Sequence, residues 1–227
     1  MDKIDFMKAI MSARTDAGFK ERTLKTFHRL IPDTGMLNSC NTLLLGGPDY
    51  FDLYVALQFI GSYFAERDMP FSYLEVGTKS GGSLLQIYDA APSHIGPITV
   101  VDVWGGEDDG IIKNTMTNFL NQLDHAKVKT KQKIEICHGD SDRYMNILHA
   151  CGRKFDVITI DARHEYEYAD RDLEFATKLL NPSGIIVFDD THHPLHSRYM
   201  KEIVDKHRSG FELFESNSGN GVAVLYR

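Results

Sequence analysis

The chain has 227 residues, of which 42% are hydrophobic and 25% charged, the usual composition of a globular protein with a sizeable core. Its formal net charge of -7 argues against broad nucleic-acid binding, because phosphate neutralisation requires clustered Lys and Arg side chains. The sequence contains no apolar run of membrane-spanning length, and its first part lacks the apolar segment of a signal peptide. Three cysteines without metal-type spacing suit a reducing compartment, so we expect a cytoplasmic protein.

Residues 1–68 have the composition of helices and loops. Between Leu53 and Phe64, apolar residues recur at helical spacing, which predicts a helix that faces the core. We expect this part to form an N-terminal helical extension or cap, and residues 69–227 to form a separate domain. An apolar helix of this kind would also suit contact between copies of the chain, which leaves a homo-oligomer open.

Strand-like and helix-like segments alternate after Pro70. The expected strands are Phe71–Val76, Ile98–Val103, Ile134–His138, Phe155–Ile160, Gly184–Phe188, Phe211–Glu215 and Val222–Tyr226. The expected helices between them are Ser83–Ala90, Ile111–Leu123, Asp142–His149, Tyr168–Leu180 and Ser197–His207. This alternation is typical of an α/β fold whose mainly parallel sheet is covered by helices on both faces.

The last two expected strands depart from this alternation, because residues 216–221 between them are too few for a helical crossover. The Gly, Asn and Ser residues of this turn favour an antiparallel hairpin at the edge of the sheet. We therefore expect a Rossmann-like, doubly wound, mainly parallel seven-stranded sheet with a C-terminal antiparallel hairpin.

The most informative stretch is Leu74–Ser83, LEVGTKSGGS, where an expected strand meets an expected helix. A strand, a tight glycine loop and a helix N-terminus together form a binding site for a nucleotide-like ligand. The loop has the spacing Gly77-x-x-x-Gly81 and not the GxGxxG of dinucleotide-binding enzymes. Glu75 would repel a pyrophosphate but suits a cationic amino-acid group, and S-adenosylmethionine (SAM) carries an ammonium and a sulfonium.

Acidic residues also close the next two expected strands, at the edge where such sheets bind ligands. Asp102 ends the second strand, where its carboxylate would accept hydrogen bonds from two ribose hydroxyls. Asp140 and Ser141 follow the third strand, where their polar groups would meet the edge of an adenine. For each of these acids, the alternative is an ordinary helix N-cap, a position that favours Asp and Ser.

The fourth expected strand ends in Asp161 and the fifth in the pair Asp189-Asp190. Neighbouring strand ends bring these carboxylates together, and buried acids repel one another unless they are protonated or bridged by a cation. Oxygen ligands without cysteine favour a hard ion such as Mg²⁺. His164 lies at the rim of the same site, where it would remove a proton from a hydroxyl held by the metal.

Other interpretations of this region stay open. One aspartate would serve as an N-cap and another would pair with Arg163 or Arg198, which leaves His164 merely exposed. Three further histidines follow Asp190, namely His192, His193 and His196. They raise the option of Zn²⁺ or Fe²⁺, or else they line the substrate entrance or face solvent.

From about Phe71 to Arg227, these motifs resemble the class I SAM-dependent methyltransferases, and specifically their metal-dependent O-methyltransferases. The resemblance implies that residues 69–227 form a SAM-binding methyltransferase domain. The residues it assigns to SAM are Glu75, Gly77, Thr78, Gly81, Ser83, Asp102, Trp104, Asp140 and Ser141. It assigns Asp161, Asp189 and Asp190 to the metal, and catalysis to His164 and Asp161. Trp104 would form a wall of the adenine site or simply pack in the core.

Within this superfamily, the catechol-type enzymes carry a lysine base three residues after the first metal-binding Asp, where this chain has His164. Sugar O-methyltransferases of the macrocin type place a histidine there, and the run Asp102–Gly106 also resembles theirs. Cephalosporin-hydroxylase-like proteins share much of this arrangement. The pair Asp189-Asp190 replaces the Asp-Asn of the catechol type and adds a negative charge.

The resemblance implies methyl transfer from SAM to a hydroxyl of a small-molecule acceptor, such as a sugar or another vicinal diol, with Mg²⁺ assisting. Neither nucleic acid nor a membrane is expected as a partner. The alternatives are a metal-independent small-molecule methyltransferase and a SAM-binding module without catalysis. A nicotinamide-dependent oxidoreductase is a further alternative, which the loop spacing disfavours.

Overall fold

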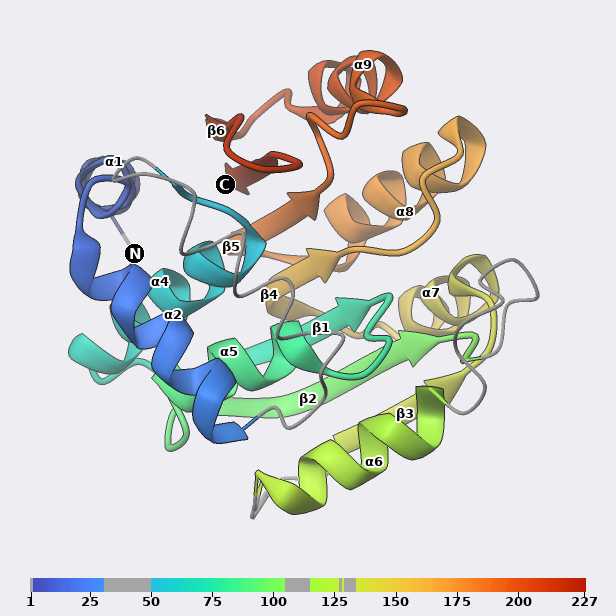
Figure 1. Ribbon diagram of the computed structural model, residues 1–227. Helices are drawn as coiled ribbons and strands as arrows, with labels where there is room; N and C mark the ends of the chain where they lie inside the picture. Colours follow the sequence, from blue (N-terminus) through green and yellow to red (C-terminus); the bar gives the residue numbers. More distant parts are fainter. Residues whose placement is uncertain (1, 31–49, 105–114, 127, 129–133) are drawn as a thin grey trace.

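The computed structural model describes residues 2–30, 50–104, 115–126, 128 and 134–227 (Figure 1). Its helices are α1 (Lys3–Ala13), α2 (Ala17–Leu30), α4 (Leu53–Glu66), α5 (Gly82–Ala90), α6 (Thr115–His125), α7 (Ser141–Ala150), α8 (Tyr166–Leu179) and α9 (Ser197–His207). Its strands are β1 (Phe71–Val76), β2 (Ile95–Asp102), β3 (Ile134–His138), β4 (Phe155–Ile160), β5 (Leu180–Asp189), β6 (Glu212–Ser216) and β7 (Val222–Tyr226). Within these ranges, none of the helices has both the length and the apolar character needed to cross a membrane.

A seven-stranded sheet runs through the molecule in the order β3-β2-β1-β4-β5-β7-β6. β1 pairs in parallel with β2 and with β4, and β3 and β5 extend this parallel part on either side. β7 lies between β5 and β6 and pairs antiparallel with both. The predicted fold class is therefore confirmed. The chain order of the strands reverses beside β1 and β4, which is where doubly wound sheets bind their ligands.

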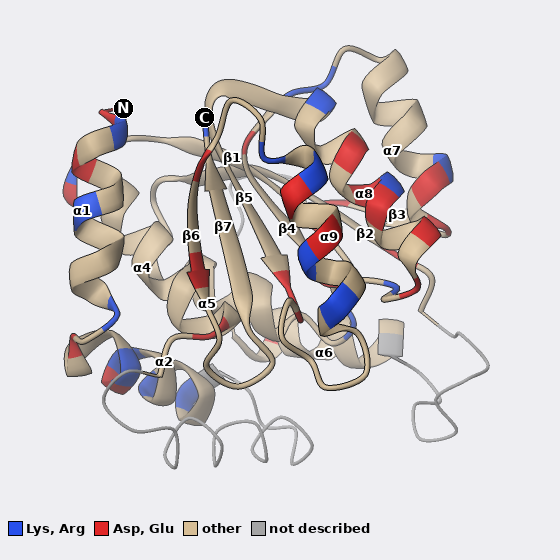
Figure 2. Ribbon diagram, turned by 90° about the horizontal axis from the view of Figure 1, so that it is seen from above, with Lys and Arg blue, Asp and Glu red and all other residues tan. Residues whose placement is uncertain are grey.

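Helices cover both faces of the sheet, and each face has its own hydrophobic cluster (Figures 1 and 2). Helices α1, α2, α4, α5 and α6 pack on one face, and α7, α8 and α9 pack on the other. Strand residues alternate between the clusters, so Tyr73 and Val157 face the first while Leu74 and Ile158 face the second. Because the central strands are buried on both sides, their sequences are almost continuously apolar.

Helix α4 begins after Asp52, whose side chain accepts a hydrogen bond from Val55 N at 3.1 Å. Its Gly61 allows close packing on α5, since a Cβ at that position would lie 2.6 Å from the Cβ of Ala90. The buried residues of α4 and Phe6 of α1 belong to the same hydrophobic cluster as the strand residues on one face of the sheet. The prediction of a core-facing helix is confirmed, whereas the division into two domains at residue 68 stays a prediction.

Some elements begin at other residues than the sequence predicted. β5 begins earlier, at Leu180, because that residue pairs with Phe155 ahead of a register shift. β2 also begins earlier, at Ile95, which pairs with the start of β1. α6 is described from Thr115 onward, and residues 111–114 of the predicted helix lie outside the described residues.

Candidate active site

The loop between β1 and α5 requires glycine at two positions. Gly77 has a φ of +86°, and a Cβ there would lie 1.9 Å from the carbonyl oxygen of Asp161. Gly81 has a φ of +87° and precedes α5, and a Cβ there would lie 2.8 Å from the Phe119 ring. The glycine loop therefore passes directly against the end of β4, which carries Asp161.

Glu75 is fully buried at the base of this loop. Its carboxylate accepts hydrogen bonds from the hydroxyls of Tyr73 at 2.6 Å and Ser83 at 2.8 Å. Burial raises the pKa of Glu75, and the hydrogen bonds act against that rise. Thr78 of the loop is buried as well. Glu75 and Ser83 thus support the loop from within the protein, and direct contact of either residue with a cofactor stays a prediction.

Asp102, at the end of β2, connects the glycine loop to the segment that follows β2. Its two carboxylate oxygens accept hydrogen bonds from the backbone N–H groups of Lys79 and Trp104, each at 2.7 Å. The indole N–H of Trp104 donates in turn to the carbonyl oxygen of Lys79 at 2.8 Å. Trp104 is 8% exposed and its ring packs against Phe119. It is therefore a core aromatic that connects the two loops, while the roles of Asp102 and Trp104 toward SAM stay predictions.

Asp140 is the N-cap of α7, and its side chain accepts a hydrogen bond from Asp142 N at 3.0 Å. Ser141 begins the helix and hydrogen-bonds to the buried Asp172 of α8. Arg163 Nη1 lies 3.9 Å from Asp140 Oδ2. The N-cap interpretation therefore holds for Asp140, and contact of Asp140 or Ser141 with an adenine stays a prediction.

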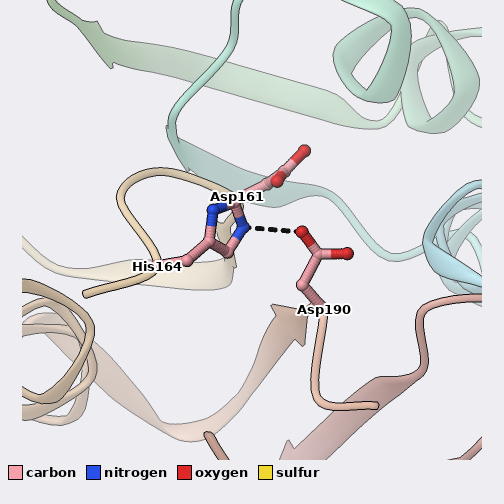
Figure 3. A group of neighbouring side chains, drawn as sticks. All are labelled: Asp161, His164 and Asp190. Atoms are coloured by element: carbon pink, nitrogen blue, oxygen red, sulfur yellow. Dashed lines mark ion pairs between the residues drawn. The ribbon is translucent and has the colours of Figure 1, made fainter. Parts of the chain in front are cut away.

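Three side chains at the ends of β4 and β5 form a compact group (Figure 3). Asp161, His164 and Asp190 each offer a potential ligand atom, and these atoms lie within 4.8 Å of one another. His164 Nε2 lies 2.6 Å from Asp190 Oδ2. Asp190 has a φ of +58°, a left-handed conformation that among residues with a side chain suits aspartate and asparagine best.

The electrostatics of this group follow from burial and from its mutual contacts. Burial raises the pKa of Asp161 to about 7, and the charge of Asp190 adds to the effect. The hydrogen bond to Asp190 raises the pKa of His164, against the effect of burial. Burial acts to raise the pKa of Asp190, but the hydrogen bond and charge of His164, together with Asn220 and His193, outweigh it, and that pKa lies below its ordinary value. In the described part of the chain, no arginine forms an ion pair with Asp161, Asp189 or Asp190.

Asp189 is not part of the three-residue group, but it lines the pocket beside it. The pocket has a volume of about 300 Å³. Its lining comes from the residues before and at the start of α4, from the ends of β4 and β5, and from the turn between β6 and β7: Tyr50, Asp52, Leu53, Tyr54, Asp161, Asp189, Asp190, Gly219, Asn220 and Gly221. Burial raises the pKa of Asp189 well above its ordinary value and that of Asp52 to about 6. The sequence had not indicated that the β6–β7 turn reaches this site.

The histidines after Asp190 divide into two kinds. The rings of His193 and His196 stack on each other at 4.9 Å, and His196 stacks on His164 at 5.3 Å. His192 packs instead against Gly221, and its backbone N–H donates to Asn220 O at 2.6 Å. Among the described residues, the group that could hold a metal contains none of these three histidines. His193 and His196 therefore form a stack of rings with His164 at the rim of the site.

Comparison with known proteins gives a family match over the centre of the chain. The family described as "Methyltransferase domain" matches residues 74–191, which run from the strand before the glycine loop to the residue after Asp190. An uncharacterised protein of Acanthamoeba polyphaga mimivirus is 25% identical over 135 residues. That alignment covers 59% of this chain and 57% of the viral protein. The matched region contains the glycine loop and the group of Asp161, His164 and Asp190.

Two solved structures share the fold. CalS11, a calicheamicin methyltransferase, has a TM-score of 0.59 at 17% identity, with 92% of this chain and 91% of that chain covered. An O-methyltransferase from Bacillus cereus, in complex with S-adenosylhomocysteine, has a TM-score of 0.57 at 15% identity. That alignment covers 89% of this chain and 96% of the other. Likeness at these identities establishes a common fold.

Proposed function

Because the chain belongs to the methyltransferase-domain family that matches residues 74–191, we propose that it transfers a methyl group from SAM to a hydroxyl oxygen of a small molecule, with a divalent metal ion assisting. The observation that carries this proposal is the group of Asp161, His164 and Asp190. It lies at the end of the strand whose backbone touches the glycine loop. A proton acceptor and candidate metal ligands thus adjoin the loop that typifies SAM sites.

We assign the SAM site to the glycine loop and the strand ends around it. SAM supplies a methyl group on a positively charged sulfur. The residues we assign to it are Glu75, Gly77, Thr78, Gly81, Ser83, Asp102, Trp104, Asp140 and Ser141. Asp102 is the best supported of them for direct contact, because it lies at a strand end. Each of its carboxylate oxygens accepts one backbone N–H, from Lys79 or Trp104, and keeps a second lone pair for a ligand. Glu75 and Ser83 act by holding the loop in shape.

The residues at the ends of β4 and β5 fit a divalent metal ion. The ligand atoms of Asp161 and Asp190 lie within 4.8 Å of each other, which compares with about 4.2 Å between ligands on opposite sides of one Mg²⁺, and Asp189 lines the same pocket. We assign the metal to Asp161, Asp189 and Asp190, whose oxygens suit Mg²⁺ or Mn²⁺. When bound, such an ion lowers the pKa of a nearby hydroxyl and offsets the repulsion among the carboxylates.

His164 is the proposed general base. Its Nδ1 atom would take the proton of the acceptor hydroxyl, while Nε2 stays paired with Asp190 Oδ2 at 2.6 Å and that carboxylate stabilises the protonated imidazole. The stacked rings of His193 and His196 restrict the orientation of His164. Positioning and charge thereby contribute to the rate, because methyl transfer itself needs no covalent help from the protein.

The adjoining pocket supports a neutral, hydroxyl-rich acceptor. Four carboxylates line it, from Asp52, Asp161, Asp189 and Asp190, and no Lys or Arg is among its described lining residues. Such a lining disfavours phosphate or carboxylate groups and favours hydrogen-bond donors such as sugar hydroxyls. Tyr50 and Tyr54 add aromatic surface on which a sugar ring would pack. We therefore propose a sugar or another vicinal diol as the acceptor, and not a nucleic acid.

A second candidate is metal-independent methyl transfer to a small molecule. The close contact of His164 with Asp190 favours it, because a histidine held by a carboxylate can act as a base without a metal ion. In that case Asp161 and Asp189 would shape the pocket and leave the proton transfer to His164.

Methyl transfer to a panel of diols and sugars, followed as formation of S-adenosylhomocysteine, tests the proposal. We expect turnover that stops in excess EDTA and returns with Mg²⁺ or Mn²⁺. Turnover that EDTA does not change would favour the metal-independent candidate. A calorimetric titration with SAM and a fluorescence titration with NADH separate the proposed cofactor from a nicotinamide, and binding of NADH alone would contradict the proposal.

A further inference from the structure

The turn between β6 and β7 is fastened to the loop that presents Asp190. Asn220 and Asp190 line the same pocket, and the Asn220 side chain helps to lower the pKa of the Asp190 carboxylate. The backbone N–H of His192 donates to the carbonyl oxygen of Asn220 at 2.6 Å. Two interactions between the same short segments, one through side chains and one through the backbone, fix their relative position.

Gly221 makes this contact possible. Its φ is +80°, and a Cβ at that position would lie 2.8 Å from the backbone nitrogen of His192 and 2.6 Å from its Nδ1. The turn is therefore in close contact with the backbone that follows Asp190. The sheet continues the attachment, because Asp189 pairs with Val222 in the antiparallel ladder of β5 and β7.

The position of the Asp190 carboxylate depends on its backbone and on its partners. The backbone is left-handed, with a φ of +58°, a conformation that aspartate adopts more readily than most residues with a side chain. The carboxylate interacts with His164 and with Asn220. Loss of the Asn220 amide would remove one of these two restraints on its orientation.

We propose that Asn220 is a positioning residue, which holds the Asp190 carboxylate toward His164 and toward the metal site. The inference rests on the proposed function and extends it to the C-terminal hairpin, which lies beyond residues 74–191 of the family match. Partners of this kind orient metal ligands and tune their affinity without touching the ion. Asn220 also lines the acceptor pocket, so the same residue links acceptor binding to the geometry of the base.

The test compares Asn220→Ala with Asn220→Ser, which keeps a hydrogen-bond donor, and with Asn217→Ala as a matched control. Asn217 is an exposed asparagine of the same turn. We expect crystal structures of Asn220→Ala to show the Asp190 carboxylate beyond about 3.2 Å from His164 Nε2. In Asn217→Ala and Asn220→Ser the pair should persist.

The second readout is the affinity for Mn²⁺, measured by calorimetry on the full chain. We expect Asn220→Ala to bind Mn²⁺ about 10-fold to 100-fold more weakly than Asn217→Ala, with Asn220→Ser close to the control. In turnover, kcat should fall while KM for SAM stays unchanged. An unmoved Asp190 together with equal Mn²⁺ affinities in Asn220→Ala and Asn217→Ala would overturn the inference. If the unmodified chain binds no Mn²⁺, the metal part of the proposed function fails, and the position of Asp190 alone decides the role of Asn220.

Discussion

His164 Nε2 and Asp190 Oδ2 lie 2.6 Å apart, although the two residues follow different strands of the sheet. Such a short contact between an imidazole and a carboxylate holds the ring in one orientation and stabilises its protonated form. Asp190 of this pair lines the proposed acceptor pocket, and so does Asp161, whose carboxylate lies within 4.8 Å of the pair. The proposed base is therefore oriented before any substrate arrives.

Replacement of His164 by alanine should therefore lower kcat about 10²-fold to 10⁴-fold, because a general base contributes a factor of this size. Affinity for SAM should change little, since His164 is not among the residues we assign to that site. Initial rates of S-adenosylhomocysteine formation and a calorimetric SAM titration provide the two measurements.

His207 offers a matched control for this variant. Its Nε2 atom lies 2.7 Å from Asp170 Oδ1, so it forms the same kind of pair between α9 and α8, apart from the pocket lining. We expect His207→Ala to lose stability but to keep its kcat per folded molecule. Equal kcat values for His164→Ala and His207→Ala would contradict the assignment of His164 as the base.

Much of the fold was predictable because its signals are local. The glycine loop, the alternation of apolar and polar segments, and the short turn before Val222 each act through backbone conformation or burial. Four strands, among them Phe71–Val76 and Phe155–Ile160, have the predicted boundaries. The early start of β5 was missed, because pairing of Leu180 with Phe155 depends on a neighbouring strand and not on the segment itself.

The site was predictable in its composition and less so in its geometry. Strand ends place Asp161 and Asp190 at one edge, which the order of segments already implied. The direction of each side chain depends on tertiary contacts, so the burial of Glu75 under Tyr73 and Ser83 had no sequence signal. The same holds for Asn220, whose proximity to Asp190 arises only because β7 inserts beside β5.

Gly77→Ala should be strongly destabilising. Its φ of +86° disfavours any side chain, and a Cβ would also collide with the carbonyl oxygen of Asp161 at 1.9 Å. Gly152→Ala is the matched control, since its φ is +68° but nothing lies within 4 Å of the added Cβ. We expect Gly152→Ala to cost about 1 kcal/mol and Gly77→Ala at least about 3 kcal/mol in chemical denaturation. Similar losses in both variants would show that the loop can move away from Asp161.

Metal binding should raise the melting temperature of the chain. An ion that binds only the folded state at 100 times its Kd adds about 2.7 kcal/mol to the free energy of unfolding. Asp161→Asn removes a proposed ligand and should abolish the shift with Mn²⁺, while Asp205→Asn, at an exposed position on α9, should retain it. The measurement is a thermal melt with and without Mn²⁺ after treatment with EDTA. An undiminished shift in Asp161→Asn would remove this residue from the metal site.

Two aspartates on α8 have opposite electrostatic environments. Burial raises the pKa of Asp172 to about 7, and its Oδ2 atom has no hydrogen-bond partner in the described part of the chain. Burial also acts to raise the pKa of Asp170, but hydrogen bonds from Lys206 and His207 outweigh it, and that pKa lies below its ordinary value. Stability should therefore depend on pH with opposite signs at the two positions.

Between pH of about 4 and 7, folded Asp172 keeps a proton that the unfolded chain releases, so its contribution to stability falls as the pH rises. Asp172→Asn removes this loss and should be about 4 kcal/mol more stable than the unmodified chain at pH 8, with the advantage gone near pH 4. Asp170→Asn should instead be less stable at pH 7, and its deficit should shrink as the pH falls through the folded pKa of Asp170. Urea unfolding of the three proteins across this range measures both effects. The contrary outcome is a difference in unfolding free energy between Asp172→Asn and the unmodified chain that stays the same at every pH. Asp172 would then be ionised in the folded chain, with a partner other than Ser141 compensating its burial.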